Sequence, residues 1–200
     1  MSTALHKVND AMEWNQVRWT EAHQIASAMG ADDDALPADG VTPEQHFRAM
    51  REQLDRGGAV RFLGHALPRL EALAWAARVL ESEAHGRELK RADRQALDFS
   101  LRWLGDPSDQ CRRAAKDAAD AAGDKSPERL LAYGVFFSGG SIAPPDLAPI
   151  PPQPQLAGQF AASAIEVAAY RAADASAAFD RALDLGERVA ADGLPALETA

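Results

Sequence analysis

The chain has 200 residues, of which 46% are hydrophobic and 6% aromatic, and its formal net charge is -9 at pH 7. Alanine dominates the hydrophobic fraction, which favours closely packed helices over a β-rich core. The negative charge repels phosphate backbones and anionic lipids, so we expect neither a nucleic-acid partner nor a membrane partner. A single cysteine, Cys111, excludes an internal disulfide. Because the sequence shows no apolar leader and no long apolar run, we expect a soluble, cytoplasmic protein.

Residues 1–41 are expected to form a first unit, made of one helix and an acidic loop. Apolar residues recur at helical spacing from residue 8 to residue 29, and Gly30 provides an end. Trp14 lies off this stripe, so it forms either a second packing face or an exposed aromatic. The run Asp32-Asp33-Asp34 lacks the alternating ligands of a calcium loop, so we expect a solvated loop there and not a cation site.

Residues 42–192 carry the helical patterns of the main domain. Thr42-Pro43-Glu44-Gln45 begins it, because Thr caps helices, Pro suits the first helical position and Gln completes a capping box. Gly57-Gly58 is expected to break that helix, and Pro68 to open a central helix with two apolar faces. Asp106-Pro107 is expected to cap and begin a later helix. The patterns in this domain lie near residues 43–54, 59–67, 68–85, 91–104, 107–122, 126–135, 160–171 and 179–190.

Half of the twelve prolines lie between residues 144 and 154, where they exclude a helix. The fold class is therefore all-α, with about eight helices and an extended, Pro-rich connector over residues 142–155. This connector either straps across the helices or presents an exposed ridge to an aromatic groove of a partner. We expect residues 193–200 to form a frayed tail.

Few residues suggest catalysis. The five histidines are scattered, and Glu81 and His85 form at most half of a metal site. Cys111 fits a buried small residue on an alanine seam ending at Ala122, a seam that serves either the core or a dimer. Ser138 and Ser141 lack the Gly-x-Ser-x-Gly pattern. We therefore expect no catalysis, no metal and no cofactor.

The glycine pair Gly139-Gly140 allows two interpretations. It either caps the preceding helix and turns the chain, which we favour, or forms a backbone nest for an anion. In the second case the protein is an enzyme or a small-anion-binding domain, with a pocket near Arg112, Arg113 and the glycine pair.

Several short motifs occur together along the chain: His65-Ala-Leu-Pro-Arg69 with Glu71, Trp75 and Ala76; Asp106-Pro-Ser108; Arg112-Arg-Ala-Ala115; Ala121-Ala-Gly123; Ser126-Pro127; Phe137-Ser-Gly-Gly-Ser141; Ala143-Pro-Pro145; and Pro151-Pro152. Together they resemble an uncharacterised bacterial family of helical proteins, often encoded near type VI secretion components. The resemblance covers residues 42–190, and the Ser-Gly-Gly-Ser/Ala-Pro-Pro block is its most specific part. Members tend to have Trp at the position of Phe137. No activity is assigned to the family, so the resemblance implies an accessory or adaptor role.

We therefore expect a non-catalytic adaptor that acts by protein contact, with a secretion component or its cargo as the partner. Its rigid loop would lose little entropy on binding. The candidate contact residues lie in and beside the connector: Phe137, Ser138, Gly139, Gly140, Ser141, Pro144, Pro145, Pro151 and Pro152.

Overall fold

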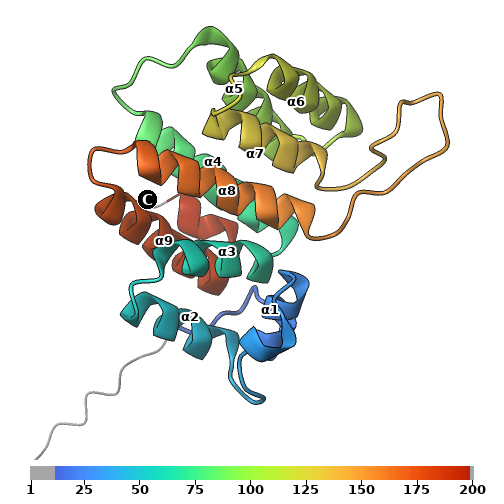
Figure 1. The fold of residues 1–200 in the computed structure, drawn as a ribbon. Coiled ribbons are helices and arrows are strands. Elements are labelled where there is room, and N and C mark those ends of the chain that lie inside the picture. The colour runs from blue at the N-terminus through green and yellow to red at the C-terminus, as the bar shows by residue number, and fades with distance from the viewer. Residues whose placement is uncertain (1–11, 199–200) are drawn as a thin grey trace, which may run out of the picture.

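The computed structural model describes residues 12–198, which contain nine α-helices, two 3-10 helices and no strand (Figure 1). The expected all-α fold is therefore confirmed. None of the helices within residues 12–198 combines the length and apolarity that crossing a bilayer requires. The elements are α1 Ala22–Ala28, η1 Asp33–Ala35, α2 Pro43–Glu52, α3 Arg56–Ala66, α4 Arg69–Ala84, α5 Arg91–Gly105, α6 Asp109–Ala121, α7 Pro127–Phe136, α8 Leu156–Arg171, α9 Ala175–Asp192 and η2 Leu194–Leu197.

Two long helices, α4 and α8, form the middle of the molecule. Helix α8 packs against α3, α4, α7 and α9, while α4 contacts α5, α7, α8 and α9. Apolar residues on both faces of α4 explain its position, because a helix that is apolar on two sides must be covered on two sides. Trp75 of α4 is fully buried, and its indole N–H donates to the carbonyl of Ala182 at 2.8 Å. The expected central helix is therefore present.

Helices α3 and α9 pack on this middle pair, and the remaining helices lie towards its two ends. Helices α5, α6 and α7 pack against one another at one end, and α1 and α2 lie at the opposite end next to α3 (Figure 1). Glycine lets α8 approach α3 closely. A Cβ added to Gly158 of α8 would lie 2.2 Å from the carbonyl oxygen of Gly64 in α3, so this crossing requires glycine.

The N-terminal prediction was wrong in its extent. Residues 12–20 are not helical, and the helix covers only Ala22–Ala28; position 8, where the predicted stripe began, lies outside the described residues. The reason is Trp14, which is only 4% exposed and packs edge-on against Phe47 at 5.1 Å. A continuous helix would place Trp14 off the buried stripe. The non-helical path of residues 12–20 instead lets the indole be buried. The segment is also tied to α9, because the Gln16 N–H donates to the carbonyl of Ala190 at 2.9 Å.

Two predicted helix boundaries were displaced by side-chain caps. Gly57-Gly58 does not break a helix but lies in the first turn of α3, where the Asp55 carboxylate accepts the Gly58 N–H at 2.9 Å. Ser108, and not Asp106, caps α6 by accepting the Cys111 N–H at 3.3 Å, so Pro107 lies before the helix. By contrast, Thr42 forms the predicted capping box of α2.

The C-terminal residues that we expected to fray are ordered up to residue 198. Leu194–Leu197 form the 3-10 helix η2, which packs against α4 and α9, and Ala196 is buried. Gly193 has a φ of 73°, so it allows the chain to turn back onto α9.

Candidate functional site

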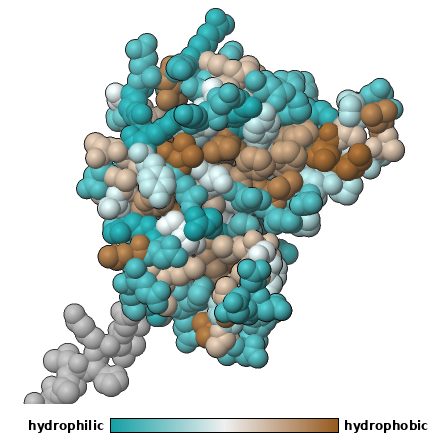
Figure 2. Space-filling model, viewed as in Figure 1, coloured by the Kyte–Doolittle hydropathy of each residue, from teal (hydrophilic) through white to brown (hydrophobic). Residues whose placement is uncertain are grey.

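The Pro-rich connector between α7 and α8 projects from the helical body as a loop (Figure 1). Every residue from 144 to 151 is exposed, including Leu147 at 59% and Ile150 at 54%. We call residues 142–152 the arm. Asp146 is the only charged residue between Phe137 and Glu166 in the sequence. Figure 2 shows apolar residues on the arm and along the neighbouring part of the body.

The arm is closed at its base by hydrogen bonds. The Ile142 N–H donates to the Ile150 carbonyl at 2.8 Å, and the Ile150 N–H donates to the Ser141 hydroxyl at 3.0 Å. That hydroxyl also accepts the Ala143 N–H at 3.1 Å. Since Ser141 joins both legs of the arm, its role in this structure is to hold the loop closed.

Arg112 of α6 anchors the turn that leads into the arm. Its guanidinium is 4% exposed and donates to the carbonyls of Phe136 at 2.6 Å and Ser141 at 2.8 Å. It also lies over the ring of Phe136, 4.9 Å from the centroid. Gly140, whose φ is 63°, passes so close that an added Cβ would lie 3.0 Å from the guanidinium. The glycine therefore serves both the left-handed turn and the close approach.

Asp109 holds this anchor in place together with its neighbour Arg113. One carboxylate oxygen accepts from Arg112 at 2.5 Å and the other from Arg113 at 2.8 Å. Hydrogen bonds from Arg112, and then from Arg113, lower the pKa of Asp109 below its ordinary value of 3.8. Arg113 also donates to the carbonyls of Ser141 and Ala143, both at 3.2 Å. Asp109 was not among the predicted residues, although its i, i+3 and i, i+4 spacing to the arginines is visible in the sequence.

These contacts favour a structural role for the glycine pair. Carbonyls of the turn point at the arginines, and Arg69 of α4 likewise donates to the Ser138 carbonyl at 3.0 Å. A nest for an anion would instead direct N–H groups at the ligand. Arg112 and Arg113 do lie beside the glycine turn, as expected, but their donors are engaged by the protein itself. The turn thus fixes the arm to the helical body.

Phe137 belongs to an aromatic cluster beneath the arm. Its ring stacks on Phe160 of α8 at 5.4 Å and meets Phe136 edge-on at 5.1 Å. Tyr133 also contacts both Phe137 and Phe160. The half-buried Phe137 ring therefore fixes the start of the arm against α8.

A cavity of about 390 Å³ is lined by Arg69 and by the end of the connector. Trp19, His65 and Arg69 line it together with Pro154, and α8 begins beside it. We call it the Trp19 cavity. Burial lowers the pKa of His65 below its ordinary value of 6.5, against a smaller opposing effect of the hydrogen bond to the Arg61 carbonyl. His65 and Arg69 lie in one sequence motif, but the sequence did not place Trp19 or Pro154 beside them, because these two residues come from distant parts of the chain.

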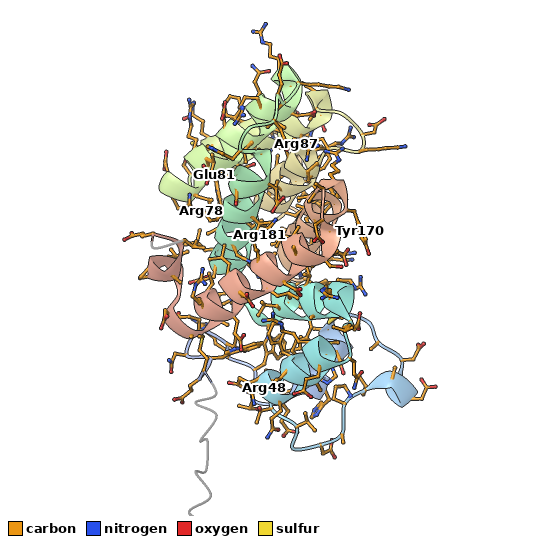
Figure 3. The ribbon with its side chains drawn as sticks, turned by 90° about the vertical axis from the view of Figure 1, so that its left-hand side faces the viewer. Arg48, Arg78, Glu81, Arg87, Tyr170 and Arg181 are labelled. Carbon is orange, nitrogen blue, oxygen red and sulfur yellow. The ribbon has the colours of Figure 1, made fainter. Side chains whose placement is uncertain are left out.

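A larger groove of about 710 Å³ separates α4 from α9. Arg78, Glu81 and Arg181 line it, and Figure 3 shows them on one face of the molecule. The predicted pair Glu81 and His85 lies here among basic and acidic side chains, without a further histidine in the lining.

Cys111 and a group of residues around α1 also carry side chains that can react or bind a metal. Cys111 is half-buried, with its sulfur 3.5 Å from an oxygen of Asp106. Within residues 12–198, one group has a metal-like arrangement: Glu21, His23 and Asp39 place ligand atoms within 4.8 Å of one another. The Glu21 carboxylate already accepts the Gly40 N–H at 2.8 Å, so it serves the turn before α2.

The comparisons with known proteins identify a family for the chain but assign it no activity. No curated protein and no solved structure matches the chain. The model of one protein family, described as a family of unknown function (DUF6931), matches residues 46–190, which span α3 to α8 and most of α2 and α9. Since this match covers more than half of the chain, the protein belongs to the DUF6931 family.

Proposed function

We propose that the protein is a non-catalytic adaptor that binds a partner protein through the arm. The observation that carries this proposal is the combination of exposure and anchoring. Leu147 and Ile150 are more than half exposed on a loop whose base is held by Arg112, Arg113 and Ser141. A preorganised apolar loop loses little conformational entropy on binding.

The composition of the arm indicates the kind of surface it fits. Five prolines within residues 142–152 stiffen the arm, and Asp146 is the only charged residue of the arm. Proline ridges of this type dock into grooves lined by aromatic side chains. The partner surface we propose is therefore a neutral, aromatic groove that receives Leu147, Ile150 and the neighbouring prolines.

The family resemblance suggests where the partner is to be found. Because the similar family is often encoded near type VI secretion components, we propose a secretion component or its cargo as the partner, met in the cytoplasm. The proposal needs no cofactor. In it, Phe137 and the Ser138–Ser141 turn hold the arm in position on the helical body. The rival function, binding of an anion by Arg112 and Arg113, would require these side chains to leave carbonyls that they now satisfy.

The test is capture of partners from the native cell under secretion-inducing conditions, followed by mass spectrometry. The variant replaces both Leu147 and Ile150 by Ser, which removes two exposed apolar side chains and keeps the backbone N–H and carbonyl with which Ile150 closes the base of the arm. The matched control is Leu54→Asn, since Leu54 is 67% exposed on the turn between α2 and α3. We expect secretion components with the wild type and the control, and their loss with the double variant. Equal capture by all three proteins would refute the arm as the contact surface.

A further inference from the structure

The Trp19 cavity differs in charge from the rest of this acidic protein. Arg69 lines it, and none of the described residues in its lining is acidic. The larger groove between α4 and α9, by comparison, includes Glu81 and Asp184 in its lining. In a chain of net charge -9, a concave site with one cation and no carboxylate favours an anionic ligand.

Arg69 has donors left for such a ligand. One N–H of its guanidinium donates to the Ser138 carbonyl at 3.0 Å, and its other donors have no acceptor among residues 12–198. This first bond fixes the side chain beside the cavity without neutralising it, because a backbone carbonyl carries no net charge. A guanidinium held in this way suits a planar carboxylate, which it can bind through two hydrogen bonds.

His65 adds a hydrogen-bond acceptor to the lining, whereas Arg69 adds donors. Its Nδ1 lies 2.8 Å from the Arg61 carbonyl oxygen, which can only accept, so Nδ1 carries the proton. The lowered pKa keeps the ring neutral at pH 7, which leaves Nε2 as an acceptor. The ring therefore adds no positive charge to the cavity and can accept a hydrogen bond from a ligand.

Trp19 forms a flat wall. Its indole N–H donates to the His65 carbonyl at 3.3 Å, which fixes the ring, while 39% of the residue remains exposed. Leu67 and Pro154 extend the apolar lining. A volume of about 390 Å³ lies in the range of small-molecule sites and accommodates a body of two fused rings.

We propose that the Trp19 cavity binds a small aromatic carboxylic acid, with its carboxylate on Arg69 and its flat body against Trp19. This site is separate from the arm contact proposed above, since neither Leu147 nor Ile150 lines the cavity. It also uses Trp19, which lies before the residues matched by the family model.

The experiment titrates the full chain with 2-naphthoate and with its neutral match, 2-naphthamide, and follows the four indole N–H signals by NMR. Trp19→Phe assigns the Trp19 signal, and the buried Trp14, Trp75 and Trp103 report on folding. We expect 2-naphthoate to shift the Trp19 signal with a Kd on the order of 1 mM or tighter, as for other ligands of this size. The amide should bind about tenfold more weakly, because it lacks the charge.

Two variants test the assigned roles. Arg69→Gln should raise the Kd for 2-naphthoate by about tenfold, because it removes the charge. Ser27→Asp should raise the Kd by a similar factor, because it places a carboxylate in the lining; it keeps Arg69, which donates to the Ser138 carbonyl. Arg113→Gln is the matched control, since Arg113 also holds carbonyls of the loop but does not line the cavity; it should bind as the wild type does. Equal binding of acid and amide, unchanged binding by folded Ser27→Asp, or a Trp19 signal that the acid does not move would each overturn the proposal.

Discussion

Arg112→Met tests whether one guanidinium holds the arm in place. Methionine fills a similar volume but donates nothing, so the Phe136 carbonyl loses the one hydrogen bond that Arg112 supplies at 2.6 Å. An unsatisfied buried carbonyl costs about 1–3 kcal/mol. Ser141 keeps its bond from Arg113, so its carbonyl loses one of two partners, at about 1 kcal/mol. We therefore expect the free energy of unfolding to fall by about 3 kcal/mol.

Urea unfolding followed by circular dichroism measures this change, with Arg113→Met as the matched control. Arg113 is more exposed than Arg112, and the Ser141 carbonyl to which it donates also accepts from Arg112. Its replacement should therefore lower the free energy of unfolding by about 1 kcal/mol or less. In Arg112→Met, amide exchange at Ile142 and Ile150 should also accelerate, because the base of the arm loosens. If Arg112→Met cost no more than Arg113→Met, the guanidinium would not be the anchor.

Three further changes test other parts of the structure. Gly158→Ala should destabilise the fold by about 3 kcal/mol, because the new Cβ would lie 2.2 Å from the Gly64 carbonyl oxygen. Gly105→Ala is the control: a Cβ there has nothing within 4 Å, so it should stabilise the fold by about 0.5 kcal/mol. Similar effects of the two changes on urea unfolding would contradict the close crossing of α3 and α8. Leu54 has a φ of 61° and is 67% exposed, so Leu54→Gly should raise stability by about 0.5 kcal/mol, and a lower thermal midpoint would refute this. Asp109→Asn should be less stable than the wild type at pH 7. Because the folded pKa of Asp109 lies below 3.8, its contribution is present above that pH and is lost as the pH falls through the folded value; a difference that persists in strong acid would contradict it.

Local chemistry explains which helices were predictable from the sequence. The Thr42 capping box and the Ser126-Pro127 start depend on neighbouring residues alone, so both were predicted correctly. The start of α3 was missed because glycine has a low helix propensity, yet the Asp55 cap and the packing of α3 on α8 outweigh it at Gly57-Gly58.

The N-terminal segment shows a different limit. Its helical spacing over residues 8–29 is genuine, but burying Trp14 against Phe47 requires a contact between positions 33 residues apart. Periodicity within a segment carries no information about such a contact, and tertiary packing overrides it.

The site was predictable in its parts but not in its assembly. Proline content alone predicted a non-helical connector, and the structure bears this out between Phe136 and Leu156. One of the two sequence-based interpretations also placed Arg112 and Arg113 near the glycine turn. It did not reveal that carbonyls would face them, since the direction of a backbone group in a loop depends on the packing of α6 against α7. The Trp19 cavity was missed because Trp19 and Pro154 lie far in sequence from His65 and Arg69.

The most direct test of the adaptor account is photo-crosslinking in the native cell, with benzoylphenylalanine incorporated in place of Leu147. Tyr170, which is 72% exposed on α8, provides the control position. The account predicts a specific crosslink from position 147 to one partner protein and none to that protein from position 170. Absence of a crosslink from position 147, or the same products from both positions, would contradict the claim that the arm is the contact surface.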